Sequence, residues 1–271
     1  MDFGLPLKFF VEQLAPNFWR FNEGMGDNPY VDAYLVVGEK RAAFIDALQS
    51  EQPRSLSEQI REITDLPVDV LITHGHPDHA GAEVKKLAEA DGFTLYMSMD
   101  DFPIARNMFA PWFTEDMFVD IKEGDVFDLG GVKLEAHRVA GHTPGSFAFL
   151  DRENKRCFTG DALGVWMQLD HSLTLTEYVS ELRKFEKVLA GVPGVRLYIG
   201  HMTQAPNGYH TAEHVTNMIE ACEKILSGEL EGQEVKLPPE MADSPMAALM
   251  KGARILQYKT ANVTYRDSKL R

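Results

Sequence analysis

The chain has 271 residues, of which 44% are hydrophobic and 25% charged, the composition of a globular protein with room for a sizeable core. Its 41 acidic and 27 basic residues give a formal net charge of −14, which repels nucleic-acid backbones and anionic membrane surfaces. The sequence contains no run of about 18 apolar residues, which a membrane span would need. We therefore expect neither a nucleic acid nor a membrane as a partner.

Cysteine usage and the N-terminal sequence both bear on the cellular compartment. Cys157 and Cys222 are the two cysteines, and two distant cysteines do not build a disulfide framework in a chain of this length. The first residues, MDFGLPLKFF, lack the basic region and long apolar run of a secretory signal peptide. These features predict a cytoplasmic protein whose N-terminal segment is part of the fold.

The first half of the chain alternates between strand-like and helix-like patterns. Strand-forming residues flank the turn Gly38-Glu39-Lys40, which is typical of a β-hairpin. Further along, apolar residues follow helical spacing in residues 54–63 and 80–90 and form compact runs in residues 68–72 and 93–97. These patterns predict strands at 33–37, 42–46, 68–72 and 93–97, and helices at 54–63 and 80–90.

The second half begins with short strands separated by turns, and helices return later. We predict strands at 118–121, 126–129, 132–136, 146–150 and 156–158, a helix at 176–190, a strand at 195–199 and a helix at about 211–227. A loop around Pro238-Pro239, a short helix near 243–251 and a final strand near 255–258 complete the chain. This order favours two sheets covered by helices, in one domain of residues 1–271 with a C-terminal elaboration from about 205.

A histidine-rich segment, Thr73-His74-Gly75-His76-Pro77-Asp78-His79, directly follows the predicted strand 68–72. His74 and His76 lie two residues apart at a strand end and suit one metal ion. Asp78 and His79 begin the next helix and suit a second ion. Imidazole and carboxylate are the ligand types of catalytic zinc sites. A single histidine would more often be a core or surface residue, but four ligand types at this spacing predict a metal site.

Three later segments place a ligand type at the end of a predicted strand or in a turn between strands. They are Gly141-His142-Thr143-Pro144-Gly145, Phe158-Thr159-Gly160-Asp161 and Tyr198-Ile199-Gly200-His201. Each alone is more often structural than functional. Strand ends that meet at one rim of a fold are, however, where binding sites assemble. With the first segment they supply seven candidate ligands, which is enough for two metals and a bridge.

In combination these motifs resemble the metallo-β-lactamase superfamily, from roughly Tyr34 to His201. The resemblance implies an α+β fold, a four-layer αββα sandwich with the metals at one edge of the sheets. It implies that His74, His76 and His142 bind the first metal, that Asp78, His79 and His201 bind the second, and that Asp161 bridges them. Asp46, at the end of an early strand, matches an acid that supports the site from behind.

The predicted function is that of a dinuclear metal-dependent hydrolase. Two Zn²⁺ ions, or Fe or Mn at one or both sites, would share a water and lower its pKa, giving a bridging hydroxide. The substrate is expected to be a small ester, thioester, lactone or phosphodiester. Asp161 would hold the metals together and Asp78 would orient the water. Two alternatives stay open: an iron-dependent oxidoreductase of the same fold, and a metal-binding protein without catalysis.

Several positions bear on the branch of the superfamily. Asp161 stands where many β-lactamases of this fold carry Cys or Ser, which disfavours a β-lactam substrate. Gly164 and Trp166 occupy the stretch where acyl-homoserine lactonases are expected to carry a tyrosine. A glutathione thioesterase would want a basic cluster near the C-terminus, and the basic residues there are scattered: Lys251, Arg254, Lys259 and Arg266. The spacing of the motifs leaves no room for the extra domain of a processing nuclease.

Two further features are less specific. Residues 100–120 are rich in aromatic and Met side chains, which favours core packing or a subunit contact over a lid for an apolar substrate. A proton donor to the leaving group has four candidates, each more often a surface or packing residue: His171, Tyr178, Tyr209 and His210. A homodimer is left open.

Overall fold

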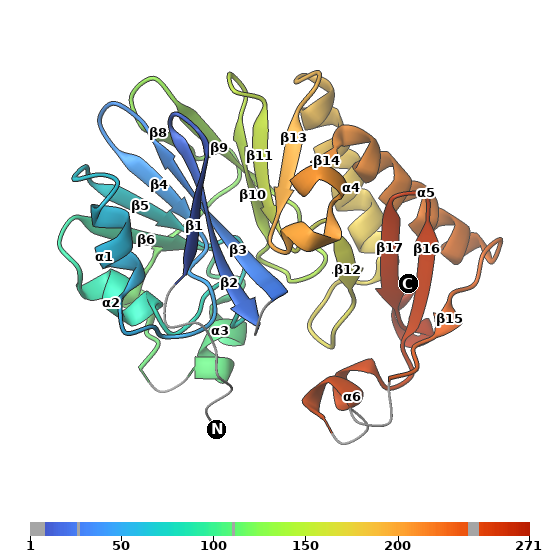
Figure 1. The fold of residues 1–271 in the computed structure, drawn as a ribbon. Coiled ribbons are helices and arrows are strands. Elements are labelled where there is room, and N and C mark those ends of the chain that lie inside the picture. The colour runs from blue at the N-terminus through green and yellow to red at the C-terminus, as the bar shows by residue number, and fades with distance from the viewer. Residues whose placement is uncertain (1–8, 26–27, 110–111, 238–243) are drawn as a thin grey trace.

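The computed structural model describes residues 9–25, 28–109, 112–237 and 244–271 (Figure 1). The predicted loop around Pro238-Pro239 and the first residue of the helix expected near 243–251 lie outside the described residues, as does the start of the N-terminal segment. No helix within the described ranges is both long and apolar enough to cross a membrane.

The N-terminal half forms a seven-stranded sheet in the order of the chain, with helices against its outer face (Figure 1). Its strands are β1 (Phe10–Ala15), β2 (Phe18–Met25), β3 (Asn28–Val37), β4 (Ala42–Ile45), β5 (Val68–Leu71), β6 (Phe93–Met97) and β7 (Val119–Asp120). The accompanying helices are α1 (Leu56–Arg61), α2 (Val84–Glu89) and α3 (Phe102–Phe109). Leu56, Val84 and Phe102 of these helices are buried against the sheet in one core cluster.

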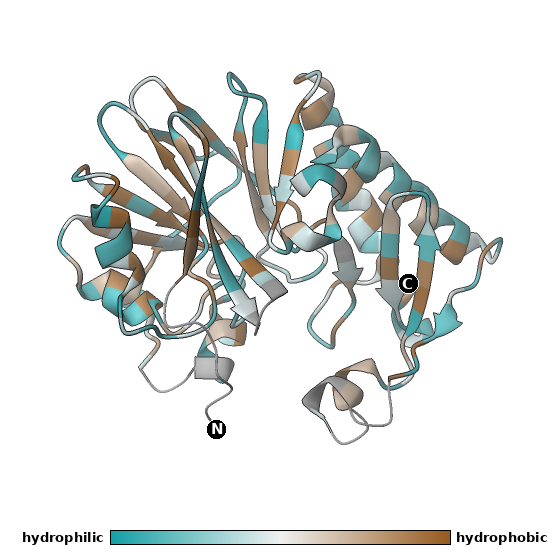
Figure 2. Cartoon of the chain, in the orientation of Figure 1, coloured by the Kyte–Doolittle hydropathy of each residue, from teal (hydrophilic) through white to brown (hydrophobic). Residues whose placement is uncertain are grey.

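The second sheet has six strands in the order β14-β13-β11-β10-β9-β8. These are β8 (Val126–Asp128), β9 (Lys133–Arg138), β10 (Phe147–Asp151), β11 (Arg156–Gly160), β13 (Arg196–Ile199) and β14 (His210–Thr211). Two long helices, α4 (Leu175–Ala190) and α5 (Ala212–Ser227), pack on its outer side. Hydrophobic and hydrophilic residues alternate along both helices, as expected for helices with one buried face (Figure 2).

The two large sheets pack face to face through an apolar layer. Phe18, Tyr34 and Ile45 of the first sheet share one core cluster with Phe149 and Phe158 of the second. Helices cover both outer faces, so the predicted four-layer αββα sandwich is confirmed.

A third, four-stranded sheet was not predicted. It consists of β12 (Val165–Met167), β17 (Ala261–Tyr265), β16 (Arg254–Tyr258) and β15 (Gln233–Glu234), in that order. The strand expected near 255–258 is β16, and the helix α6 (Pro245–Met250) extends away from this sheet (Figure 1). Because β12 pairs with β17, which follows it by almost a hundred residues, local sequence patterns carried no signal for this pairing.

Two predictions about the first half differ from the structure. The helix expected at 80–90 begins only at Val84, because residues 82–83 form a turn behind the histidine-rich segment. Strands β1 and β2 were missed. Phe18 and Phe21 of β2 are buried on opposite faces of the sheet, so this strand lacks the alternation of a half-exposed strand.

The aromatic stretch at 100–120 is mostly packing. Phe102, Phe113 and Phe118 are buried in the core between the first sheet and its helices. The preference for packing over a lid is therefore confirmed for these three side chains.

Candidate metal centre

The segment His74 to His79 lies on a tight loop directly after β5. The backbone N–H groups of His79 and Ala80 donate to the carbonyl oxygen of His76 at 3.0 and 2.8 Å, which turns the chain back on itself. The other predicted ligands follow β11 and β13 or lie in the turn between β9 and β10. The structure brings all seven of them together in two adjacent groups.

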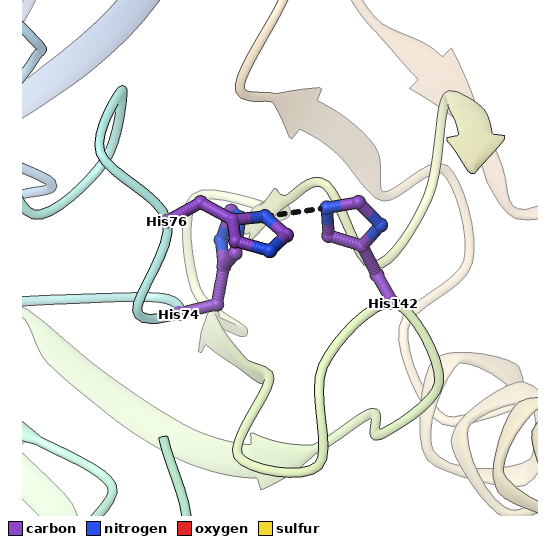
Figure 3. A group of neighbouring side chains, drawn as sticks. All are labelled: His74, His76 and His142. Atoms are coloured by element: carbon purple, nitrogen blue, oxygen red, sulfur yellow. Dashed lines mark hydrogen bonds between the residues drawn. The ribbon is translucent and has the colours of Figure 1, made fainter. Parts of the chain in front are cut away.

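The first group consists of His74, His76 and His142, all buried (Figure 3). The Nδ1 atom of His76 lies 3.0 Å from Nε2 of His74 and 2.9 Å from Nε2 of His142. One nitrogen of each ring therefore points to a common centre. Three imidazole nitrogens converging in this way could hold a metal ion, and they match the ligand set of some catalytic zinc sites.

Hydrogen bonds on the outer side set the tautomers of His74 and His142. The Thr73 hydroxyl donates to Asp46 Oδ2 at 2.9 Å, so it accepts from Nδ1 of His74 at 3.1 Å. Nδ1 of His142 donates to the carbonyl oxygen of Met167 at 2.9 Å. With their protons on Nδ1, both rings direct an Nε2 lone pair to the centre of the group.

The second group consists of Asp78, His79, Asp161 and His201. Nε2 of His201 lies 3.3 Å from Oδ2 of both Asp78 and Asp161. Nδ1 of His79 donates to Asp46 Oδ2 at 2.8 Å, and its fully buried Nε2 has no hydrogen-bond partner among the described residues. An unpartnered buried polar atom is costly, and a metal ion would satisfy this one.

Asp161 lies between the two groups. Its Oδ1 is 3.4 Å from Nε2 of His79, and its Oδ2 is 3.9 Å from Nε2 of His142 in the first group. Asp46, predicted to support the site from behind, contacts Thr73 and His79, so it acts on both groups through one carboxylate.

The two groups differ in their electrostatics. Burial, together with His142, lowers the pKa of His76 to about 2, and burial also lowers the pKa of His74, so these two rings are held neutral. Burial also opposes charge on His201, but Asp161 and Asp78 outweigh it and raise the pKa of His201 to about 11. The second group therefore retains protons at its histidines, and a divalent cation bound there would displace them. The donor types, their convergence and the unpartnered nitrogen of His79 all fit a pair of divalent metals.

One supporting residue, Asp101, was missed by the sequence analysis. It is fully buried and accepts from the backbone N–H groups of Gly75 and Gly145 at 2.8 and 2.7 Å, and from the Thr143 hydroxyl at 2.6 Å. It thus joins the loop of His74 and His76 to the loop of His142. Burial raises the pKa of Asp101, although the hydrogen bond from Thr143 opposes the rise.

Gly200 leaves no space for a side chain beside the second group. A Cβ atom there would lie 2.3 Å from Cε1 of His79 and 2.7 Å from Oδ1 of Asp161. We expect Gly200→Ala to displace the His79 ring, to lower the metal content and to reduce hydrolysis about 100-fold. Metal analysis and steady-state kinetics would test this. Gly191→Ala, which creates no contact below 3.4 Å, is the control, and full metal content in Gly200→Ala would contradict the prediction.

Of the four candidate proton donors, His171 alone lies beside the metal centre, with Nε2 2.7 Å from Nε2 of His76. Tyr178 is fully buried against Trp166 and donates to the carbonyl oxygen of Ala162. The other two also lie in packed surroundings, with His210 stacked on His214 and Tyr209 against Tyr198.

A cavity of about 560 Å³ opens onto both groups. Its remaining wall combines apolar and polar side chains: Tyr30, Gln49, Pro77, Met167, Leu169, Asp170, His171, Thr203, Gln204 and Leu249. None of these described lining residues is Lys or Arg.

Comparisons with known proteins agree with this geometry. The sequence profile of the metallo-beta-lactamase superfamily matches residues 26–201. A hydroxyacylglutathione hydrolase, GloC, of Haemophilus influenzae is 35% identical over 143 residues, which are 46% of this chain and 62% of that protein. The human acyl-coenzyme A thioesterase MBLAC2 is 28% identical over 116 residues, 36% of this chain and 42% of that protein. The chain thus spans less than two thirds of either relative.

Solved structures show the same fold at low sequence identity. A metallo-beta-lactamase from Pontibacter korlensis superposes with a TM-score of 0.60 at 15% identity, covering 79% of this chain and 98% of that one. A beta-lactamase domain protein from Burkholderia ambifaria gives 0.61 at 18% identity, covering 80% and 78%.

Proposed function

This chain belongs to the metallo-β-lactamase superfamily, and we propose that it is a metal-dependent hydrolase of acyl thioesters. The observation that carries the proposal is the arrangement of the seven ligand side chains around two adjacent centres, with Asp161 between them. The proposed ligands are His74, His76 and His142 for one metal and Asp78, His79 and His201 for the other, with Asp161 as the bridge.

The residues of the chain have distinct tasks in this proposal. Two divalent metals, proposed to be zinc, would lower the pKa of a shared water towards neutrality and polarise the acyl oxygen. Asp161 keeps the two centres together. Asp78 faces the cavity, where its carboxylate is 3.4 Å from the hydroxyl of Tyr30, so it is placed to orient the attacking water. Asp46 and Asp101 hold the histidine loops from behind.

The leaving group favours a thioester over an oxygen ester. A thiol with a pKa of about 8.5 leaves as a thiolate, whereas an alcohol needs a proton donor. Tyr178, Tyr209 and His210 do not line the cavity, so His171 is the one candidate donor of the four that a bound substrate could reach. Two relatives support the same choice: GloC is named as a hydroxyacylglutathione hydrolase and MBLAC2 as an acyl-coenzyme A thioesterase.

The charge of the cavity bears on which part of the substrate enters it. Asp78, Asp161 and Asp170 line it, and no described lining residue is Lys or Arg. Met167, Leu169 and Leu249 supply apolar surface. We therefore propose that an uncharged acyl group occupies the cavity and that any anionic part of the thiol carrier stays outside.

A panel of substrates tests the proposal. The purified protein would be assayed against acyl thioesters with neutral and carboxylate-bearing acyl groups, the matching oxygen esters, a lactone, a phosphodiester and a β-lactam, each with and without chelator. The expected result is chelator-sensitive hydrolysis of neutral acyl thioesters, at rates above those of the esters. Turnover only of the phosphodiester or the β-lactam, or oxygen consumption in place of hydrolysis, would contradict the proposal.

A further inference from the structure

The outer nitrogens of the ligand histidines follow one pattern, with one exception. Four of these rings have an oxygen atom as the partner of the nitrogen that faces away from the metal centre. For His74, His79, His142 and His201 these partners are Thr73 Oγ1, Asp46 Oδ2, the Met167 carbonyl and the Tyr30 carbonyl. Each such bond places the proton on the outer nitrogen and the lone pair towards the centre.

His76 has no such oxygen. Its Nδ1 faces His74 and His142, so Nε2 is its outer nitrogen, and Nε2 lies 2.7 Å from Nε2 of His171. We propose that His171 is a positioning residue, which accepts a hydrogen bond from Nε2 of His76 and so keeps the Nδ1 lone pair of His76 directed at the first metal. His171 itself belongs to neither group of converging ligand atoms.

The loop that carries His171 is held by the C-terminal part of the chain. The ammonium group of Lys269 donates to three carbonyl oxygens of this loop, those of Leu169 at 3.1 Å and of Asp170 and Ser172 at 2.7 Å. The Ser172 hydroxyl in turn donates to the carbonyl oxygen of His142 at 2.6 Å. Two ligands of the first metal, His76 and His142, are therefore supported from one short loop.

Through Lys269, the C-terminal elaboration helps to hold the loop that lies behind the first metal site. Arg266, at the end of β17, adds an ion pair with the exposed Asp170 at 2.9 Å. A pair so exposed contributes little by itself. The three bonds from Lys269 are the firmer link, because they fix backbone atoms on both sides of His171.

Metal affinity is the readout that tests this role, because it does not depend on the substrate or on the proposed reaction. Metal-free protein would be titrated with Co²⁺ and with Zn²⁺, and the Co²⁺ absorption bands would report the geometry of the first site. We expect His171→Ala to weaken binding at the first site about 10- to 100-fold. His171→Gln, whose side-chain oxygen can accept from His76, is expected to restore most of the affinity.

A second variant acts on the loop from a distance. Lys269→Met removes the three bonds to the loop carbonyls without touching the metal centre, and we expect a smaller loss of affinity, about three- to tenfold. His137→Ala is the matched control, because His137 on β9 contacts Glu123 and Glu135 away from the cavity. Thermal unfolding of the metal-free variants checks that each one folds.

The outcomes separate this proposal from its alternatives. Weaker metal binding in His171→Ala, with recovery in His171→Gln, supports a positioning role even if no thioester is hydrolysed. Unchanged metal affinity with a reduced kcat would assign His171 to the substrate or the leaving group and would overturn the proposal. Equal loss of affinity in His171→Ala and His171→Gln would also overturn it, because the hydrogen bond would then not be the cause.

Discussion

Replacement of Asp161 by alanine is expected to lower kcat/KM for hydrolysis at least about 1000-fold, which corresponds to about 4 kcal/mol of transition-state stabilisation. Asp161 is the carboxylate within 4 Å of histidine nitrogens from both groups. Without it the second group would lose a ligand and the two centres would lose their bridge. We therefore expect the metal content to fall from two ions per chain to one or fewer.

Metal analysis after dialysis, together with steady-state kinetics on a thioester, would measure both effects. Asp65→Ala is a suitable control, because Asp65 is an exposed acid remote from the cavity. Asp161→Asn sharpens the test, since it preserves the shape of the side chain but removes its charge. If Asp161→Ala kept two metals and full activity, both the bridge and the proposed mechanism would be wrong.

Removal of the metals is expected to abolish activity and to lower the thermal stability of the whole protein. Binding to the folded state alone adds about 4 kcal/mol for one site when the free metal exceeds its Kd 1000-fold. In a domain of this size, that amount shifts Tm by roughly 10 °C. Calorimetry before and after chelation, followed by a return of metal, would measure the shift and the recovery of activity.

The same experiment identifies the metal. Zinc, manganese and iron would be added back separately to the metal-free protein, and hydrolysis and oxygen consumption would be followed for each. We expect zinc to restore hydrolysis. Activity that resists chelation, or oxygen consumption that returns only with iron, would contradict a zinc-dependent hydrolase and favour the oxidoreductase alternative.

Much of the ligand set could be predicted because the residues just before several of the ligands form a recognisable strand pattern. His74 follows a compact apolar strand, and Asp161 and His201 each follow an apolar run and a glycine. Strand ends meet at one rim of a sandwich, so the position of these residues after predicted strands is enough to make them candidates for one site.

Other features of the site had no local pattern to reveal them. Asp101 lies in a stretch whose aromatic composition indicated packing, and it supports two loops by accepting from the backbone N–H groups of Gly75 and Gly145, contacts that no local sequence pattern indicates. The carbonyl oxygens of Met167 and Tyr30 orient His142 and His201, and a carbonyl oxygen carries no sequence signature. The third sheet was missed for a related reason, since β12 pairs with a strand far along the chain.

The histidine-rich segment from His74 to His79 illustrates which features the sequence determined and which only the tertiary structure decided. The sequence by itself determined the ligand types, their order and the expectation of two sheets covered by helices, because these follow from side-chain chemistry and from short-range periodicity. Tertiary structure alone decided which ring nitrogen faces the metal centre, which groups hold each ring, and that His171 stands behind His76. Those features depend on atoms that only long-range packing brings within hydrogen-bonding distance.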